Sequence, residues 1–114
     1  MNIEEYTSRT GTQMRKGTLE FCILLIVAQG EVYAGDIISK LRAGDQLVVE
    51  GTLYPILSRL NRDDLVTYRW EESQSGPPRK YYSLSDHGKK AVISLTENWN
   101  DLSETIKHLM NHHA

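Results

Sequence analysis

The chain has 114 residues, of which 39% are hydrophobic and 25% charged, and its formal net charge is −2. These values are ordinary for one globular domain and exclude both a disordered chain and a polycation. Any contact with nucleic acid must therefore come from local basic patches.

The longest apolar run, residues 21–28, is too short to span a bilayer, and it lacks the flanking pattern of a signal peptide. The single cysteine, Cys22, lies inside this run, so we expect a buried structural thiol and no disulfide within the chain. Together these features predict a cytoplasmic protein.

The N-terminal part of the sequence predicts two helices. The first dozen residues are polar, and we expect them to be loose or to form a short helix. Residues 13–29 are apolar throughout their second half, which also fits a buried strand, but their length favours a central helix that Gly30 ends. Residues 36–42 form a short amphipathic helix of about two turns, and residues 43–46 are a break.

Residues 51–70 combine two periodicities. The first half has the apolar spacing of a helix, at Leu53, Ile56, Leu57 and Leu60. Pro55 is compatible with this helix because it lies in the first turn. Residues 65–72 alternate as a strand does, residues 73–78 are rich in turn formers, and residues 79–85 predict a second strand. The two strands would form a hairpin with a loop of about seven residues.

Residues 86–114 predict one long helix. Ser85 is a good N-cap and Asp86 suits the first turn. The apolar residues then follow the 3, 4, 3, 4, 3 spacing of a heptad seam, at Val92, Leu95, Trp99, Leu102, Ile106 and Leu109. We expect this seam to form the interface of a homodimer.

The order helix, short helix, helix, hairpin, long helix predicts an α+β, mainly helical fold, a winged helix-turn-helix with a C-terminal dimerisation helix. Residues 1–85 would be the DNA-binding domain, with a recognition helix at about 50–63 and a wing hairpin at about 65–85, and residues 86–114 the dimerisation helix. A recognition helix needs one packed face and one face that can touch base edges and phosphates. Thr52, Tyr54 and Arg59 are expected on the outward face.

The chain resembles members of the PadR family of bacterial transcriptional regulators, in the short subgroup of that family. The resemblance depends on GTLEFCILLIV, YAGDI, GTLYPILSRL and GPPRKYYSLSDHG, at residues 17–27, 33–37, 51–60 and 76–88. The third and fourth segments together are specific, whereas either alone is a weaker signal. The resemblance implies a dimeric repressor that releases DNA when it binds a small aromatic molecule.

The candidate DNA contacts are polar or basic residues of the recognition helix and wing, with one residue of the preceding helix: Thr52, Tyr54, Pro55, Arg59, Arg79, Lys80 and Lys40. In a wing, Arg79 and Lys80 fit phosphate contact better than an ordinary solvated pair. Tyr54 and Pro55 could instead only shape the start of a packed helix, and Thr52 could only begin it.

Trp99 has two interpretations. It could be a large side chain of the dimer seam, or two copies of it near a two-fold axis could hold a planar aromatic ligand. Ser103 is a polar neighbour for such a ligand. Met14, Phe21 and Leu25 could supply a wall of this site, or they could belong to the core.

Other functions are less well supported by the sequence. A winged-helix module that binds only proteins is the alternative, because the chain is mildly acidic. The sequence has no Gly-rich phosphate loop and no nucleophile with a matched base, so we do not expect an enzyme. His108 and His112 have a metal-compatible spacing but no apparent third ligand, and we predict neither a metal site nor a cofactor.

Overall fold

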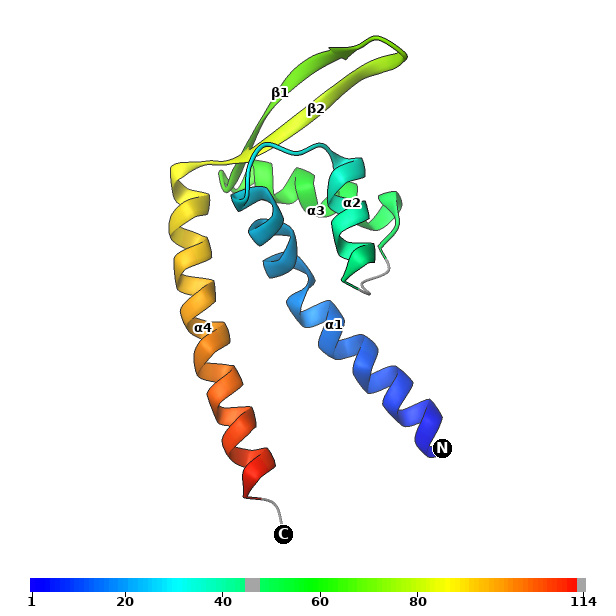
Figure 1. Cartoon of the computed structure of the whole chain (residues 1–114), viewed down its shortest axis with the longest axis vertical. Helices are drawn as coiled ribbons and strands as arrows, with labels where there is room; N and C mark the ends of the chain where they lie inside the picture. The colour runs from blue at the N-terminus through cyan, green and yellow to red at the C-terminus, as the bar shows by residue number, and fades with distance from the viewer. Residues whose placement is uncertain (45–47, 113–114) are drawn as a thin grey trace.

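A computed structural model describes residues 1–44 and 48–112. Within these residues four helices and one two-stranded antiparallel sheet follow each other in the order α1, α2, α3, β1, β2, α4 (Figure 1). The helices are α1 (Ile3–Ala28), α2 (Ala34–Ala43), α3 (Glu50–Arg62) and α4 (Asp86–Asn111), and the strands are β1 (Val66–Ser73) and β2 (Gly76–Leu84). This order confirms the predicted winged helix-turn-helix with a long C-terminal helix. The predicted break at residues 43–46 lies partly outside the described residues.

Helix α1 runs unbroken from Ile3 to Ala28, so the expectation that the first dozen residues are loose or form a short helix was wrong. Asn2 caps the helix, because its side-chain oxygen accepts a hydrogen bond from the backbone N–H of Glu5 at 2.8 Å. Glu4 and Glu5 lie in the first turn, where negative charge favours the helix. These local signals start the helix well before its apolar half begins.

The core lies where the C-terminal half of α1 meets α2, α3 and the base of the hairpin. Its largest fully buried side chains are Ile23, Leu24, Ile37, Leu53, Leu57, Leu60 and Val66. Three of these belong to the helical stripe predicted on α3. Burial of each such side chain stabilises the fold by roughly 1.5–3 kcal/mol, which fixes α3 with its opposite face toward solvent.

The hairpin is longer, and its turn shorter, than predicted. The strands pair from Val66↔Leu84 to Ser73↔Gly76, so only residues 74–75 separate them and the loop of about seven residues was wrong. The register shifts between Glu71 and Ser73, where the two prolines at 77 and 78 lie opposite one residue. Proline is tolerated here because a two-stranded ribbon leaves one side of each strand unpaired.

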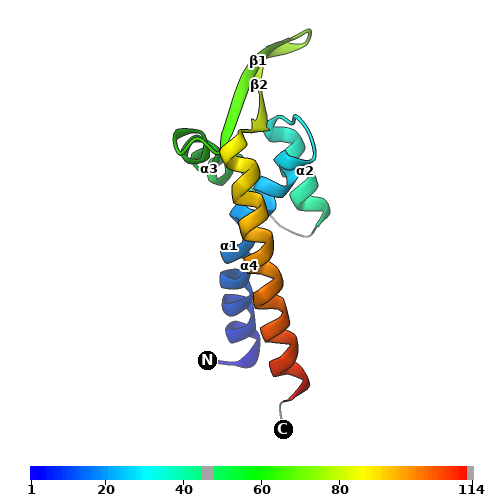
Figure 2. The ribbon, with the colours of Figure 1, turned by 90° about the vertical axis from the view of Figure 1, so that its left-hand side faces the viewer.

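Helix α4 begins at Asp86 with Ser85 as its N-cap, as predicted. The backbone N–H of Gly88 donates to Ser85 Oγ at 2.9 Å, and Ser85 Oγ donates to the carbonyl of Asp64. Figures 1 and 2 show that α1 and α4 both extend from the core away from the hairpin, so the two termini lie at the same end of the molecule. None of the helices in the described part of the chain has the length and hydropathy that a membrane span requires.

Candidate nucleic-acid interface

A groove separates α3 from the wing, meaning the β1–β2 hairpin. The α3 side is formed by Glu50, Tyr54 and Ser58, which are spaced four residues apart and therefore share one face of the helix. The wing contributes Trp70, Arg79 and Lys80 among others. The groove thus places a polar helix face opposite two cations of the hairpin.

The candidate residues near the start of α3 are accessible. Thr52, Tyr54 and Pro55 are all exposed, while the neighbouring Leu53 is fully buried. The side chain of Tyr54 lines the groove, whereas Thr52 and Pro55 are not among its lining residues. Burial of Leu53 therefore fixes the rotation of α3 that leaves these three side chains in solvent.

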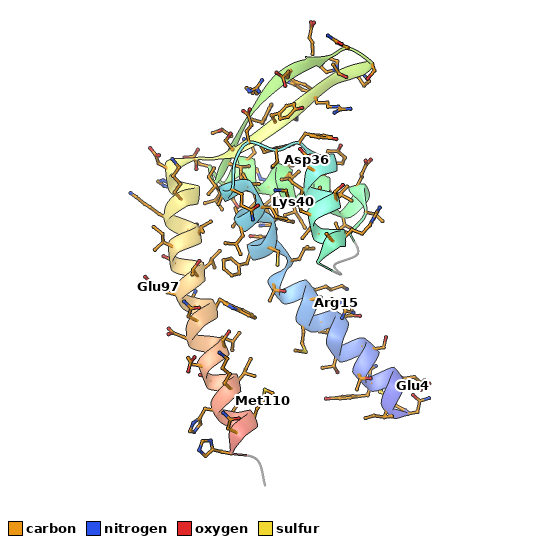
Figure 3. The ribbon with its side chains drawn as sticks, in the orientation of Figure 1. Glu4, Arg15, Asp36, Lys40, Glu97 and Met110 are labelled. Atoms are coloured by element: carbon orange, nitrogen blue, oxygen red, sulfur yellow. The ribbon has the colours of Figure 1, made fainter. Side chains whose placement is uncertain are left out.

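Arg59 of α3 forms an ion pair that the sequence did not predict. Its guanidinium forms an ion pair with the carboxylate of Glu20 on α1, instead of standing free on the outer face of α3. The hydrogen bond from this pair raises the pKa of Arg59 above its ordinary value. Lys40 is exposed on α2 (Figure 3), and its Nζ donates to Gln29 Oε1 at 3.1 Å. A phosphate contact by Arg59 would therefore compete with Glu20, whereas the ammonium of Lys40 keeps further N–H donors for such a contact.

Arg79 and Lys80, two of the three cations of the wing, rest on aromatic rings. The guanidinium of Arg79 lies 4.5 Å from the ring centroid of Tyr33. Lys80 Nζ lies 4.3 Å from the ring centroid of Tyr68 and 5.2 Å from that of Trp70. Cation–π attraction at such exposed sites stabilises by about 0.5–1 kcal/mol and leaves the positive charge intact. Arg79 and Lys80 thus combine a preferred position with a full charge.

Arg69, at the middle of β1, is neutralised by carboxylates. Its Nε and Nη2 donate to the two oxygens of Glu31 at 2.8 and 2.7 Å, and its Nη1 lies 3.5 Å from Glu71. The hydrogen bond from Arg69 lowers the pKa of Glu31 below its ordinary value. Among the described residues, Arg79 and Lys80 therefore remain as the wing cations without an ion pair.

Several residues of this interface were not predicted as functional residues from the sequence. Trp70 is 60% exposed, and its ring meets that of Tyr68 edge-on at a centroid distance of 6.2 Å. Tyr68 and Trp70 are two residues apart on β1, so the alternation of a strand places both rings on one face. This spacing could have predicted the pair from the sequence. Glu31 and Tyr33 gave no such signal, because their partners Arg69 and Arg79 lie far away in the sequence.

The predicted dimer and ligand residues divide between the core and the surface. Val92 and Leu95 pack against the core, whereas Trp99, Leu102, Ile106 and Leu109 are 41% to 63% exposed. On α1, Phe21 and Leu25 are half-buried and Met14 is exposed. Ser103 of α4 is half-buried. The seam predicted on α4 therefore leaves the core after its first two members.

The histidines near the end of α4 interact with each other. The rings of His108 and His112 lie 4.1 Å apart between centroids, and Nδ1 of His112 lies 2.8 Å from the carbonyl oxygen of His108. Over residues 1–44 and 48–112, no group of three or more His, Cys, Asp or Glu side chains is arranged to hold a metal ion.

Comparison with known proteins identifies the family. Residues 23–93 match the transcriptional regulator PadR-like family. A PadR-like transcription factor from Bacteroides fragilis is 50% identical, with a TM-score of 0.75 over 89% of this chain and 98% of that one. A PadR-like transcriptional regulator from Bacillus cereus is 36% identical, with a TM-score of 0.79 over 89% of this chain and 99% of that one.

A third similar structure contains DNA. Bacillus subtilis PadR in complex with operator DNA is 26% identical, with a TM-score of 0.64 over 68% of this chain and 46% of that one. The family match covers more than half of the chain and agrees with the winged-helix order. The chain therefore belongs to the PadR-like family and is a transcriptional regulator, not an enzyme.

Proposed function

We propose that this regulator is a homodimeric repressor that binds operator DNA with α3 and the wing and leaves it when a planar aromatic molecule binds. The observation that carries the proposal is the groove between Tyr54 on α3 and the cations Arg79 and Lys80 on the wing. A helix face can reach base edges in the major groove while a cationic hairpin reaches the flanking phosphates. That Bacillus subtilis PadR binds operator DNA supports the same use of this fold.

The α3 residues and the wing residues would have different roles. Thr52, Tyr54 and Pro55 lie on the exposed side of α3, where they can meet base edges and nearby phosphates. Arg79 and Lys80, on the hairpin that flanks α3, would bind phosphate. An operator as the target places this activity in the cytoplasm.

The exposed stripe on α4 supports the dimer. Trp99, Leu102, Ile106 and Leu109 repeat at heptad spacing on a helix that extends beyond the core. A second copy of the same helix would cover this stripe by the packing that heptad repeats favour. A two-fold dimer then presents two copies of α3 to half-sites on the order of 34 Å apart.

Trp99 supports the proposed ligand site. It is the large aromatic residue of the stripe, so a two-fold axis close to it would bring two indole rings together. Ser103 lies one turn further along α4, and Met14, Phe21 and Leu25 of α1 would complete the wall. A flat aromatic molecule fits between two indoles because stacking and apolar burial both favour it.

Fluorescence-anisotropy titration with the DNA upstream of the protein's own gene tests the proposal. We expect saturable binding that resists a scrambled competitor, and release of this DNA by planar aromatic compounds. Ligand binding should quench Trp99 emission, which a Trp70→Phe variant isolates because the chain has two tryptophans. Absence of DNA binding at low salt would overturn the proposal and favour a module that binds a protein partner.

The wing assignment has its own test. Replacing Arg79 and Lys80 together by alanine should weaken binding to every DNA sequence about equally. Each lost phosphate contact should reduce the slope of log K against log salt by about 0.9. An unchanged salt slope in the double variant would show that the wing does not contact phosphate.

A further inference from the structure

The segment between α1 and α2 is attached to the base of the wing. Glu31 holds Arg69 of β1 through two hydrogen bonds of 2.7 and 2.8 Å. Val32 forms a β-bridge with Tyr82 of β2, with backbone N–H···O distances of 3.1 and 2.7 Å. The first strand and the second strand are therefore each tied to this short segment.

Tyr33 continues these contacts toward the end of the wing. Its ring lies 5.7 Å from that of Tyr81 between centroids, and the guanidinium of Arg79 lies 4.5 Å from its centroid. The ring also lies close to Gly35, where a Cβ atom would come within 2.6 Å of the Tyr33 Cε2 atom. The Tyr33 ring is thus close both to the start of α2 and to Arg79 of the wing.

We propose that Tyr33 is a positioning residue for DNA binding, because its ring, seated on Gly35, holds the Arg79 guanidinium where it meets a DNA phosphate. The inference rests on the proposed function, and it adds that the start of α2, outside the wing, decides where this wing cation lies. Glycine at position 35 is needed for this arrangement, because any larger residue would displace the Tyr33 ring.

The physical need for such a residue follows from the shape of the wing. A two-stranded ribbon that projects from the core has no second sheet to hold it, as Figure 1 shows for β1 and β2. An exposed arginine side chain samples many rotamers, and ordering it on binding costs conformational entropy. A ring that attracts the guanidinium in the free protein reduces this cost without neutralising the charge.

Gly35→Ala is the decisive variant, because it moves the ring without removing it. The atom in the way is the end of a flexible side chain, and alanine is the better helix former, so the thermal midpoint should not fall. Tyr33→Leu removes the ring, and Tyr33→Phe keeps it. The Tyr33 side chain makes no capping hydrogen bond to α2, so these changes do not remove a helix cap.

The measurement is DNA affinity by anisotropy at fixed salt, for each variant with Arg79 and with Arg79→Ala. We expect Gly35→Ala and Tyr33→Leu to weaken binding by about two- to fivefold per wing, and Tyr33→Phe to bind as the wild type does. In the Arg79→Ala background none of them should weaken binding further, because the group that Tyr33 positions is absent. Gly17→Ala is the matched control, since a Cβ there meets nothing within 4 Å.

Three outcomes would overturn the inference. Wild-type affinity in Gly35→Ala and Tyr33→Leu, or equal weakening by them with and without Arg79, would show that Tyr33 does not act through Arg79 while leaving the proposed function intact. A wild-type protein that binds no DNA at low salt would overturn the proposed function and the inference together.

Discussion

The basic residues around the candidate interface are not equivalent. Arg59 and Arg69 are held by carboxylates that compensate their charge, so a phosphate must compete with Glu20 or Glu31 for them. Arg79 and Lys80 rest on rings and have no ion pair among the described residues, and a ring leaves the charge available to a phosphate. Local pairing therefore matters more than the number of basic residues when phosphate contacts are assigned.

Glu50 is the acidic residue on the groove-facing side of α3. It lines the same groove as Arg79 and Lys80, so its carboxylate would repel a phosphate backbone lying there. We predict that Glu50→Gln tightens binding to nonspecific DNA at low salt by up to about fivefold, the effect of one unit charge a few ångströms away in water. Anisotropy with random-sequence DNA measures this change.

The gain should disappear as salt rises, because screening removes it. Tighter binding that persisted at high salt, or no change at low salt, would place Glu50 away from the backbone. Glu104→Gln, at the far end of α4 and highly exposed, is the control that should leave the affinity unchanged.

The junction between the hairpin and α4 is the most constrained point between two elements. Gly88 is buried in the first turn of α4, and a Cβ atom there would lie 2.0 Å from the backbone carbonyl oxygen of Leu65. Ser85 caps the same turn and reaches the carbonyl of Asp64. The start of α4 is therefore fixed against the segment that enters β1.

We predict that Gly88→Ala lowers the free energy of unfolding by about 1–3 kcal/mol, the usual cost of overpacking, because backbone must move to admit the methyl group. Urea-induced unfolding followed by circular dichroism measures this. Gly17→Ala is the comparison, and it should raise stability by up to about 1 kcal/mol because it improves an exposed helix. Equal stability of the two variants would show that the close approach at Gly88 is absent in solution.

At the scale of the whole molecule, the winged core and the two long helices present separate surfaces. The wing and α3 groove lie at one end, and α1 and α4 extend from the other (Figures 1 and 2). The apolar stripe of α4 lies on the part of the helix beyond the core, so its cover must come from another molecule in the proposed dimer. Dimer formation and DNA contact would then use separate surfaces.

We predict that Leu102→Glu converts the proposed dimer to a monomer, because it would bury a charge in the heptad seam. The fold should persist, since Leu102 is exposed in the single chain. Light scattering gives the molar mass, and operator affinity should fall by about a hundredfold or more because two half-sites no longer bind together. Ser94→Glu, at an exposed off-seam position of the same helix, should remain dimeric. A dimeric Leu102→Glu protein would locate the interface elsewhere.

The sequence by itself determined the order of the elements, the buried stripe of α3 and the Ser85 cap. Each of these depends on residues within one or two turns of one another, and the periodicity or cap chemistry is therefore visible locally. The start of α1 was also local, and the Asn2 cap with Glu4 and Glu5 was the signal that could have shown it.

Only the tertiary structure decided which cations are free and how the wing is held. Arg59 meets Glu20 from 39 positions away, and Arg69 meets Glu31 from 38. The short turn of the wing likewise depends on the strand register. The prolines next to the turn predicted a longer loop, so the sequence did not show this register. Pairing of this kind is set by how helices and strands pack together, and no periodicity within a single segment encodes it.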